Sequence, residues 1–159
     1  MEKIVFNIIK SISHEELVNL IRTALYGSTY LSASYDKEFY ASLPNNKKVG
    51  ETFEDKLVDC LLNGGEIYLD DNDSKGEVYG KNRAEVIDKD GLKVTRYTLT
   101  LIDVIRGLER ALNGEYEGYE MENQWVSHCF SRFENNCDDF NNEEADSLIQ
   151  VILFHGIEY

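Results

Sequence analysis

The sequence predicts a single α+β domain in which a small, mainly antiparallel sheet packs with four to five amphipathic helices. Three observations lead to this fold class. Four stretches repeat apolar residues at helical spacing and meet a glycine at their ends. Short β-branched and aromatic runs lie between them. The 159 residues are 42% hydrophobic, which suffices for one buried core despite a net charge of −14. We therefore assign residues 1–159 to one globular domain.

The four main helices are expected where capping residues precede apolar stripes. Ser13 with Glu16 forms a predicted capping box, and Thr52 and Thr100 open two later helices. The glycines after each stripe predict left-handed C-terminal caps. A fifth, shorter helix is expected over residues 124–133. The four stripes and their glycines span Ser13 to Gly27, Thr52 to Gly65, Thr100 to Gly114 and Ala145 to Gly156.

Strands are expected in the apolar runs between the helices. Asp90-Gly91 suits the positive φ angles of a tight hairpin turn and joins the last two runs. The sheet is therefore expected to be largely antiparallel. The predicted strands are Lys3 to Ile9, Glu66 to Leu69, Val78 to Tyr79, Ala84 to Ile87 and Leu92 to Leu99.

Negative charge is concentrated towards the C-terminus. Residues 1–50 contain 5 acidic (Asp, Glu) and 6 basic (Lys, Arg) residues, and residues 51–110 contain 14 acidic and 9 basic ones. Residues 111–159 contain 11 acidic residues and 1 basic residue. Such a field repels nucleic-acid backbones and attracts basic protein surfaces. Direct nucleic-acid binding is therefore disfavoured, and a basic protein is the expected partner.

The cysteines and the N-terminus predict a soluble protein of a reducing compartment. Cys60, Cys129 and Cys137 follow no metal-ligand or disulfide spacing, and the first two lie among apolar residues as small buried hydrophobes. We identify no signal pattern and no apolar run of about 20 residues, the length that spans a bilayer. A cytoplasmic location in a host cell and no membrane association are expected.

No motif predicts catalysis or a cofactor. Asp71, Asp73 and Gly76 imitate the opening of a calcium loop. Lys75 stands where the fifth position needs an oxygen ligand and Asn82 where the twelfth needs a glutamate, so a polar turn is expected instead. Structural roles are also expected for the three histidines, which are His14, His128 and His155. We predict a protein that is not an enzyme and holds no metal.

A tyrosine-rich segment, residues 26–40, suits a binding surface, because tyrosines are rigid and amphipathic and its serines supply adaptable hydroxyls. The alternative is a strand and loop whose aromatic side chains pack on the core, and this alternative is somewhat favoured. As a ligand site for a nucleotide-like molecule, the segment offers Tyr26, Ser28, Tyr30, Tyr35 and Tyr40.

The acidic residues of the C-terminal third form the other candidate site. Glu143, Glu144 and Asp146 have a local reason, because acids are favoured at a helix N-terminus. The helix N-terminus does not explain the remaining acids, several of which alternate with tyrosines and which have almost no basic neighbours. The candidate partner-binding residues are Glu115, Tyr116, Glu117, Tyr119, Glu120, Glu122, Glu134, Asp138 and Asp139.

Three blocks of the sequence resemble a group of small, uncharacterised phage and mobile-element proteins. They span Ala24 to Tyr30, Leu61 to Tyr68 and Ala145 to Gly156, and Thr98 to Leu101 follows the central strands as in that group. His155 departs from the phenylalanine–glycine ending of the group, and residues 72–92 resemble an inserted hairpin. The resemblance implies a phage or prophage origin and supplies no catalytic residues.

Charge and resemblance together predict an accessory protein that binds a basic host protein, for example to inhibit a nucleic-acid-binding defence factor. The alternative function is a small-ligand protein that sequesters a nucleotide-like molecule through the tyrosine-rich segment. Neither pattern fixes an oligomeric state.

Overall fold

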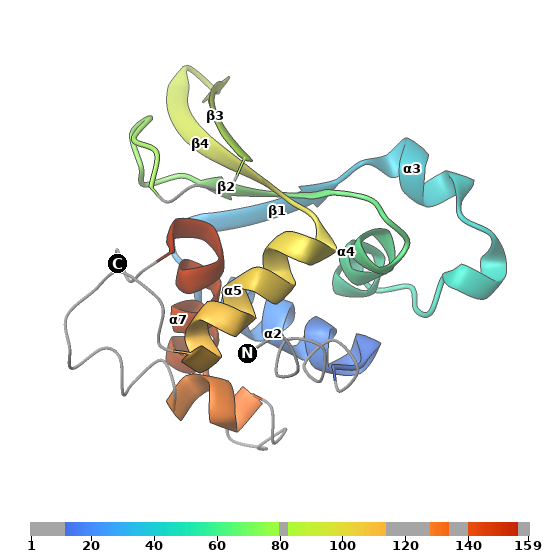
Figure 1. The fold of residues 1–159 in the computed structure, drawn as a ribbon. Coiled ribbons are helices and arrows are strands. Elements are labelled where there is room, and N and C mark those ends of the chain that lie inside the picture. Colours follow the sequence, from blue (N-terminus) through green and yellow to red (C-terminus); the bar gives the residue numbers. More distant parts are fainter. Residues whose placement is uncertain (1–11, 80–82, 114–127, 134–139, 156–159) are drawn as a thin grey trace.

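The chain is an α+β domain built around one antiparallel sheet (Figure 1), as expected from the sequence. The computed structural model describes residues 12–79, 83–113, 128–133 and 140–155. Within these residues, four strands follow the order β1-β2-β4-β3. The strands are β1 (Leu31–Tyr35), β2 (Ile67–Asp71), β3 (Arg83–Lys89) and β4 (Leu92–Leu99). The helices are α2 (His14–Gly27), α3 (Lys37–Ser42), the 3-10 turn η1 (Asn45–Lys47), α4 (Phe53–Leu62), α5 (Leu101–Asn113) and α7 (Asn142–Phe154).

The described long helices lie together on one face of the sheet (Figure 1). Side chains alternate between faces along a strand, so Leu69 and its cross-strand partner Tyr97 point to the same side. Both are buried in the core. Asp70 and its partner Arg96 belong to the opposite face, where they pair with each other. The sheet thus has an apolar face against the helices and a polar face beyond them.

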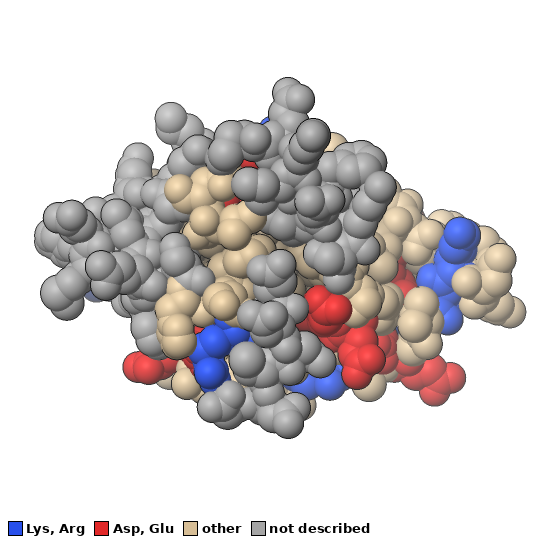
Figure 2. Space-filling view, turned by 60° about the horizontal axis from the view of Figure 1, so that its bottom comes forward, with Lys and Arg blue, Asp and Glu red and all other residues tan. Residues whose placement is uncertain are grey.

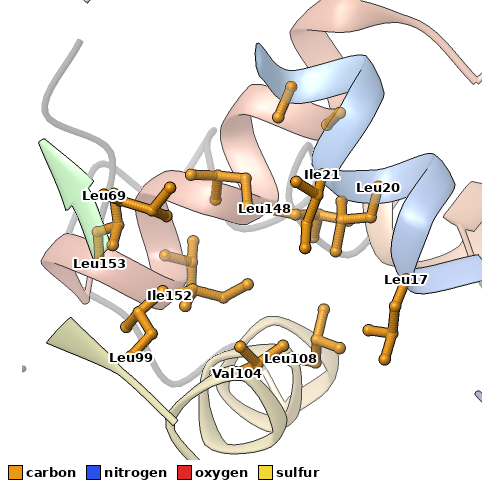
Figure 3. Packing of buried hydrophobic residues seen from close by; sticks show 14 of the residues in the cluster. Leu17, Leu20, Ile21, Leu69, Leu99, Val104, Leu108, Leu148, Ile152 and Leu153 are labelled. Atoms are coloured by element: carbon orange, nitrogen blue, oxygen red, sulfur yellow. The ribbon is translucent and has the colours of Figure 1, made fainter. Parts of the chain in front are cut away.

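Helix α7 is the centre of the core. Leu148, Ile152 and Leu153 of this helix meet residues of α2, α5 and the sheet (Figure 3). Nearly every residue of α7 is buried, including the polar Gln150 and Glu144. A helix surrounded on all sides must be largely apolar, which explains the run Leu-Ile-Gln-Val-Ile-Leu-Phe in its sequence.

The predicted helix starts are confirmed. Ser13 Oγ accepts a hydrogen bond from the Glu16 N–H, and Thr52 forms a full capping box with Asp55. Thr100 does the same with Asp103, whose carboxylate accepts from the Thr100 N–H at 2.8 Å. These contacts satisfy N–H groups that a helix start leaves without partners. They fix where each of these helices begins.

The glycines at the ends of the helices are there for more than one structural reason. Gly64 follows α4 with a φ of 85°, the left-handed cap that was expected. At Gly27 that expectation is wrong, because this residue is the last of α2 and its φ is not positive; an added Cβ would meet Asn142 Cβ at 2.3 Å. The left-handed residue after α7 is His155, with a φ of 62°. Gly114 and Gly156 lie outside the described residues.

Among the strands, the prediction for Ala84 to Ile87 and for Leu92 to Leu99 is confirmed, with positive φ at Asp90 and Gly91 in the turn. The predicted strand Val78 to Tyr79 is wrong. The Tyr79 N–H donates to the Tyr97 hydroxyl at 2.9 Å, and the Tyr79 ring packs on Phe154, so this segment covers the sheet end.

Two further predictions concern residues that the structure does not fully describe. The strand predicted for Lys3 to Ile9 lies wholly outside the described residues. The expected helix over residues 124–133 is observed for its described part, residues 128–133. Cys129 on this helix and Cys60 on α4 are buried and free, as expected for small hydrophobic residues, whereas Cys137 is not described. Of the segment 72–92, β3 pairs with β4, and Asn72 to Gly76 form the turn after β2.

Candidate functional site

The predicted acidic docking residues of the C-terminal third lie outside the described part of the chain. This holds for all nine of them, which are Glu115, Tyr116, Glu117, Tyr119, Glu120, Glu122, Glu134, Asp138 and Asp139. Their role as a docking surface stays a prediction. The three acids with an expected structural reason, Glu143, Glu144 and Asp146, are described and belong to the first turns of α7.

The tyrosine-rich segment is described in full, and it does not form a single site. Tyr30 is buried, and its hydroxyl donates to Asp146 Oδ1 at 2.7 Å. Ser28 Oγ accepts from the N–H groups of Tyr30 and Leu31, which turns the chain from α2 into β1. Tyr26, in the last turn of α2, is 79% exposed. Buried and exposed tyrosines therefore alternate within a few residues.

Tyr35 and Tyr40 form a separate cluster at the far end of β1. Their rings meet edge to face at 5.8 Å, and Tyr35 also packs on Phe53 of α4. Lys48 and Lys56 place their ammonium groups 5.0 Å and 5.6 Å from the Tyr40 ring centre. Burial, with a further contribution from the Asp59 charge, raises the pKa of the Tyr40 hydroxyl. This cluster joins β1, α3 and α4, which is a structural role.

A pocket of about 250 Å³ opens where α2 ends and α7 begins, and we name it the α2–α7 pocket. It contains Ser28 and Tyr30, two of the five tyrosine-segment candidates, but neither Tyr26 nor the Tyr35–Tyr40 cluster. Among the described residues that line it, none is a lysine or an arginine. The lining residues are Gly27, Ser28, Thr29, Tyr30, Asp73, Asn142, Glu143 and Asp146.

Three carboxylates give the α2–α7 pocket its charge. Asp146 is held in place by the Tyr30 hydroxyl and by Gln150 Nε2, which donates to its second oxygen at 2.6 Å. Asp73 and Glu143 are exposed at the rim. The N-terminus of α7 contributes a partial positive charge of about half a unit, which is smaller than the three negative charges. The pocket therefore favours a cation, such as an ammonium or guanidinium group.

Several basic side chains that could offset the acids are engaged inside the fold. Arg132, the one Lys or Arg of residues 111–159, pairs with the buried Glu144. Asp70 takes two hydrogen bonds from Arg96 and faces Lys89 Nζ at 3.4 Å, and its hydrogen bond to Arg96 raises the pKa of that guanidinium. These contacts pair three of the basic side chains with acids of the same chain.

Arg110 is similarly engaged. Its Nη2 donates to the carbonyl oxygens of Val151 and Ile152 near the end of α7. Those carbonyls lie in the last turn of the helix, where the dipole favours a cation. Burial lowers the pKa of the Arg110 side chain. Arg110 therefore holds α5 to α7 and offers little charge to a partner.

Acidic and basic side chains are interspersed on the described part of the face in Figure 2. A group of Asp and Glu lies below and to the right of its centre, with Lys and Arg on either side of it. The described part of this face therefore carries charges of both signs rather than one continuous acidic patch.

Sequence reasoning missed one buried polar cluster, between α2 and α4. Asp59 is 1% exposed, and its carboxylate accepts from the Val49 N–H and contacts His14 Nε2 at 2.9 Å. His14 Nδ1 lies 3.9 Å from an oxygen of Asp55. Asp59 stands in a stripe of apolar residues, Leu57-Val58-Asp59-Cys60-Leu61, and a charge inside such a run was the available signal. The cluster fastens the loop before α4 to both helices.

The loop that imitates a calcium site is a hydrogen-bonded turn. Asp71 Oδ1 accepts from the Asp73 N–H, and the Ser74 hydroxyl donates to Thr95 Oγ1 at 2.8 Å. Lys75 and Gly76 both have positive φ. Within residues 12–79, 83–113, 128–133 and 140–155, no group of three or more Asp, Glu, His or Cys side chains is arranged to hold a metal ion.

Comparisons with known proteins identify no relative: no family model, curated protein or solved structure matches this chain. The resemblance to phage proteins therefore stays a prediction. Across the helices that the structure describes, none has the length and apolar character needed to cross a bilayer.

Proposed function

We propose that this protein is a non-enzymatic accessory protein that binds a basic segment of another protein and takes one of its lysine or arginine side chains into the α2–α7 pocket. The observation that carries this proposal is the lining of that pocket, whose described residues include the carboxylates of Asp73, Glu143 and Asp146 and no basic side chain. The net charge of −14 would draw a basic partner towards the molecule before contact.

The geometry of the pocket favours a side chain over a free small molecule. Its volume of about 250 Å³ lies just below the range of roughly 300–1,000 Å³ in which drug-sized ligands are buried. A lysine or arginine side chain is slender and carries one charge at its end. Tyr30 and Gln150 hold Asp146 in one position, so the buried end of the pocket is organised before a ligand arrives.

The biological setting follows from the sequence resemblance. A protein encoded by a phage or prophage would meet a basic host protein in the cytoplasm, and a nucleic-acid-binding defence factor is one such partner. Binding at its basic surface would compete with nucleic acid and inhibit it. In this proposal the acids of residues 115–139 add to the same attraction.

The first test measures binding of a fluorescent oligolysine peptide by anisotropy at low and physiological salt. The pocket variant Asp73→Asn/Glu143→Gln removes two rim charges and leaves Asp146 with its structural hydrogen bonds. We expect it to weaken binding by about fivefold, because two nearby charges are lost. The matched control, Glu15→Gln/Glu38→Gln, removes two exposed acids at the start of α2 and on α3, and we expect less than about a twofold effect.

A third variant, with glutamine at positions 115, 117, 120 and 122, separates the two acidic regions. Equal losses in the pocket variant and the control would show that only overall charge matters and would reject the pocket. A loss confined to the third variant would move the docking surface to the C-terminal third. Binding that does not weaken with salt would reject an electrostatic partner altogether.

A further inference from the structure

The two edges of the described sheet differ in how they are protected. At one edge, β3 (Arg83–Lys89) carries four charged residues in seven, and such charges discourage pairing with another strand. At the other edge, β1 has the sequence Leu-Ser-Ala-Ser-Tyr, with no charge and no proline. An uncharged edge strand is suited to accept an additional strand.

The register of β1 shows which backbone groups face outwards. The Asn72 N–H donates to the Tyr30 carbonyl at 2.8 Å, so Tyr30 and Asn72 form a hydrogen-bonded pair in the antiparallel ladder. Hydrogen-bonded and non-hydrogen-bonded pairs alternate along such a ladder. Ser32 and Ser34 therefore direct their N–H and C=O groups to β2, and Ala33 directs both of its groups away from it. In the part of the chain that the structure describes, no strand lies on that side of β1.

A groove of about 300 Å³ runs beside this edge, and we name it the β1 groove. Tyr26 and Phe53, which are 79% and 43% exposed, belong to its lining, and Glu54 supplies a carboxylate. Leu31 and Ala33 reach it from the inner face of the sheet. An added strand that pairs with Ala33 would point alternate side chains into the groove. The lining residues are Leu25, Tyr26, Leu31, Ser32, Ala33, Phe53 and Glu54.

The charge of the molecule decides between two occupants of this edge. A second copy pairing through β1 would bring two chains of net charge −14 together and place Glu54 of each beside the shared edge. A basic chain meets no such repulsion. Tyr26 and Leu31 of the β1 groove adjoin Gly27 and Tyr30 of the α2–α7 pocket in sequence, so the acidic pocket lies next to the groove along the chain.

We propose that β1 is a docking strand: an extended, basic segment of the partner protein adds antiparallel to β1, pairs its backbone with Ala33 and places alternate apolar side chains in the β1 groove. The basic character of the segment rests on the proposed function, whereas the backbone pairing rests on the register and the groove. The two are separated by a test that changes the backbone of a ligand without changing its charge.

The test uses the peptide Lys-Val-Lys-Val-Lys-Val-Lys with blocked ends and two N-methylated forms of it. A residue directly opposite Ala33 shares its face, so each valine that enters the groove also directs its N–H to β1. N-methylation of the valines should therefore weaken binding by about tenfold or more, the loss of one to two hydrogen bonds. N-methylation of three lysines should change the dissociation constant by less than about threefold. Equal effects of the two forms would overturn the proposal.

Variants of the protein give the second arm. Ala33→Pro removes the outward N–H, which would donate to a carbonyl of the added strand, and should weaken binding of the unmodified peptide, with folding checked by circular dichroism. If Ala33→Pro fails to fold, Tyr26→Ser/Phe53→Ser opens the groove and should weaken the unmodified peptide instead. Wild-type-like binding by whichever of these variants folds would overturn the docking strand.

Two further outcomes are informative. If Asp73→Asn/Glu143→Gln leaves affinity unchanged while the N-methylated peptides still differ, the docking strand stands and the pocket proposal fails. Analytical ultracentrifugation of the full chain tests the other occupant. A dimer that Ala33→Pro dissociates would overturn the assignment of the edge to a basic partner.

Discussion

Gly107 is a residue whose importance comes from one close approach. Helix α5 meets α7 so tightly there that a Cβ built on Gly107 would lie 2.6 Å from Ile152 Cα. In an exposed helix, glycine is less favourable than alanine by about 0.5–1 kcal/mol. Here the backbone of the neighbouring helix reverses that preference.

We expect Gly107→Ala to lower the free energy of unfolding by about 1–3 kcal/mol, because the helices must move apart to admit a methyl group. Urea denaturation measures it as a lower midpoint. In an Ile152→Ala background the same substitution should cost less, since that change removes Ile152 Cγ1, the nearest of the three closest atoms. An unchanged or higher midpoint for Gly107→Ala would show that α5 and α7 separate at no cost.

The buried thiols give a residue-scale prediction about pH. Burial, which penalises the thiolate, raises the pKa of Cys60 to about 11 and that of Cys129 to about 12. In the unfolded chain both ionise near their ordinary value of 9.0. Their contribution to stability is therefore fully present below pH 9 and is lost as the pH rises towards 11 and 12. Each thiol should lower the free energy of unfolding by up to about 1.4 kcal/mol per pH unit in that window.

Comparison with the variant Cys60→Ala/Cys129→Ala isolates this effect, because other groups that titrate at alkaline pH are common to both proteins. We expect the wild type to lose stability more steeply than the variant between pH 9 and 11, as followed by urea midpoints. Parallel pH profiles would mean that the thiols ionise equally well in the folded and unfolded states.

At the scale of elements, one buried carboxylate ties α4 to its neighbours. Asp59 accepts hydrogen bonds from the Val49 N–H at 3.1 Å and contacts His14 Nε2 at 2.9 Å, so it joins α4 to the preceding loop and to α2. The apolar neighbours of Asp59 exclude water, which makes an unmatched polar group there costly.

We expect Asp59→Ala to lower the free energy of unfolding by about 2–4 kcal/mol, because it leaves the Val49 N–H and His14 without their acceptor. Asp36→Ala is a useful comparison, since Asp36 only caps the short helix α3 at the surface and should cost about 1 kcal/mol. Chemical denaturation of both variants gives the two values. Equal costs would mean that water replaces the lost carboxylate at the buried site.

Sequence patterns predicted the elements whose signals are local. The caps at Thr52 and Thr100 and the turn at Asp90-Gly91 depend on residues within four positions of each other and were found as expected. At Ser13 only half of the expected capping box forms: its hydroxyl accepts from the Glu16 N–H, and the Glu16 carboxylate accepts from that hydroxyl. Strand β1 alternates Leu31, Ala33 and Tyr35 with two serines, which agrees with the strand expected as the alternative for this segment, but its pairing with β2 had to be seen in three dimensions. The close approach of Gly27 to Asn142 is equally invisible in sequence.

The candidate site shows the same limit. Ser28 and Tyr30 were candidates because of their residue types, yet their partners Asp73, Asn142 and Asp146 come from distant parts of the chain. The helix dipole was reason enough to set Glu143 and Asp146 aside as local features. In the fold both acids also line a pocket, because the end of α2 lies beside the start of α7.

At the scale of the whole molecule, uncompensated negative charge opposes folding. The chain has 30 acidic and 16 basic residues, and several of the basic ones are held in internal pairs such as Arg132 with Glu144 and Arg96 with Asp70. Acids left at the surface repel one another more in the compact state than in the extended one. Salt screens repulsion between exposed charges over about 10 Å but affects buried pairs much less.

Moderate salt should therefore stabilise this protein, in contrast to a fold held by surface ion pairs. We expect the melting temperature to rise by a few degrees on going from low salt to about 0.15 M NaCl, a gain of about 1 kcal/mol or less. Potassium chloride should act equally, because screening depends on ionic strength and not on the identity of the cation. A selective effect of divalent cations at equal ionic strength would contradict simple screening and would indicate a bound ion. A fall in melting temperature would show that attractive pairs at the surface outweigh the repulsion among the acids.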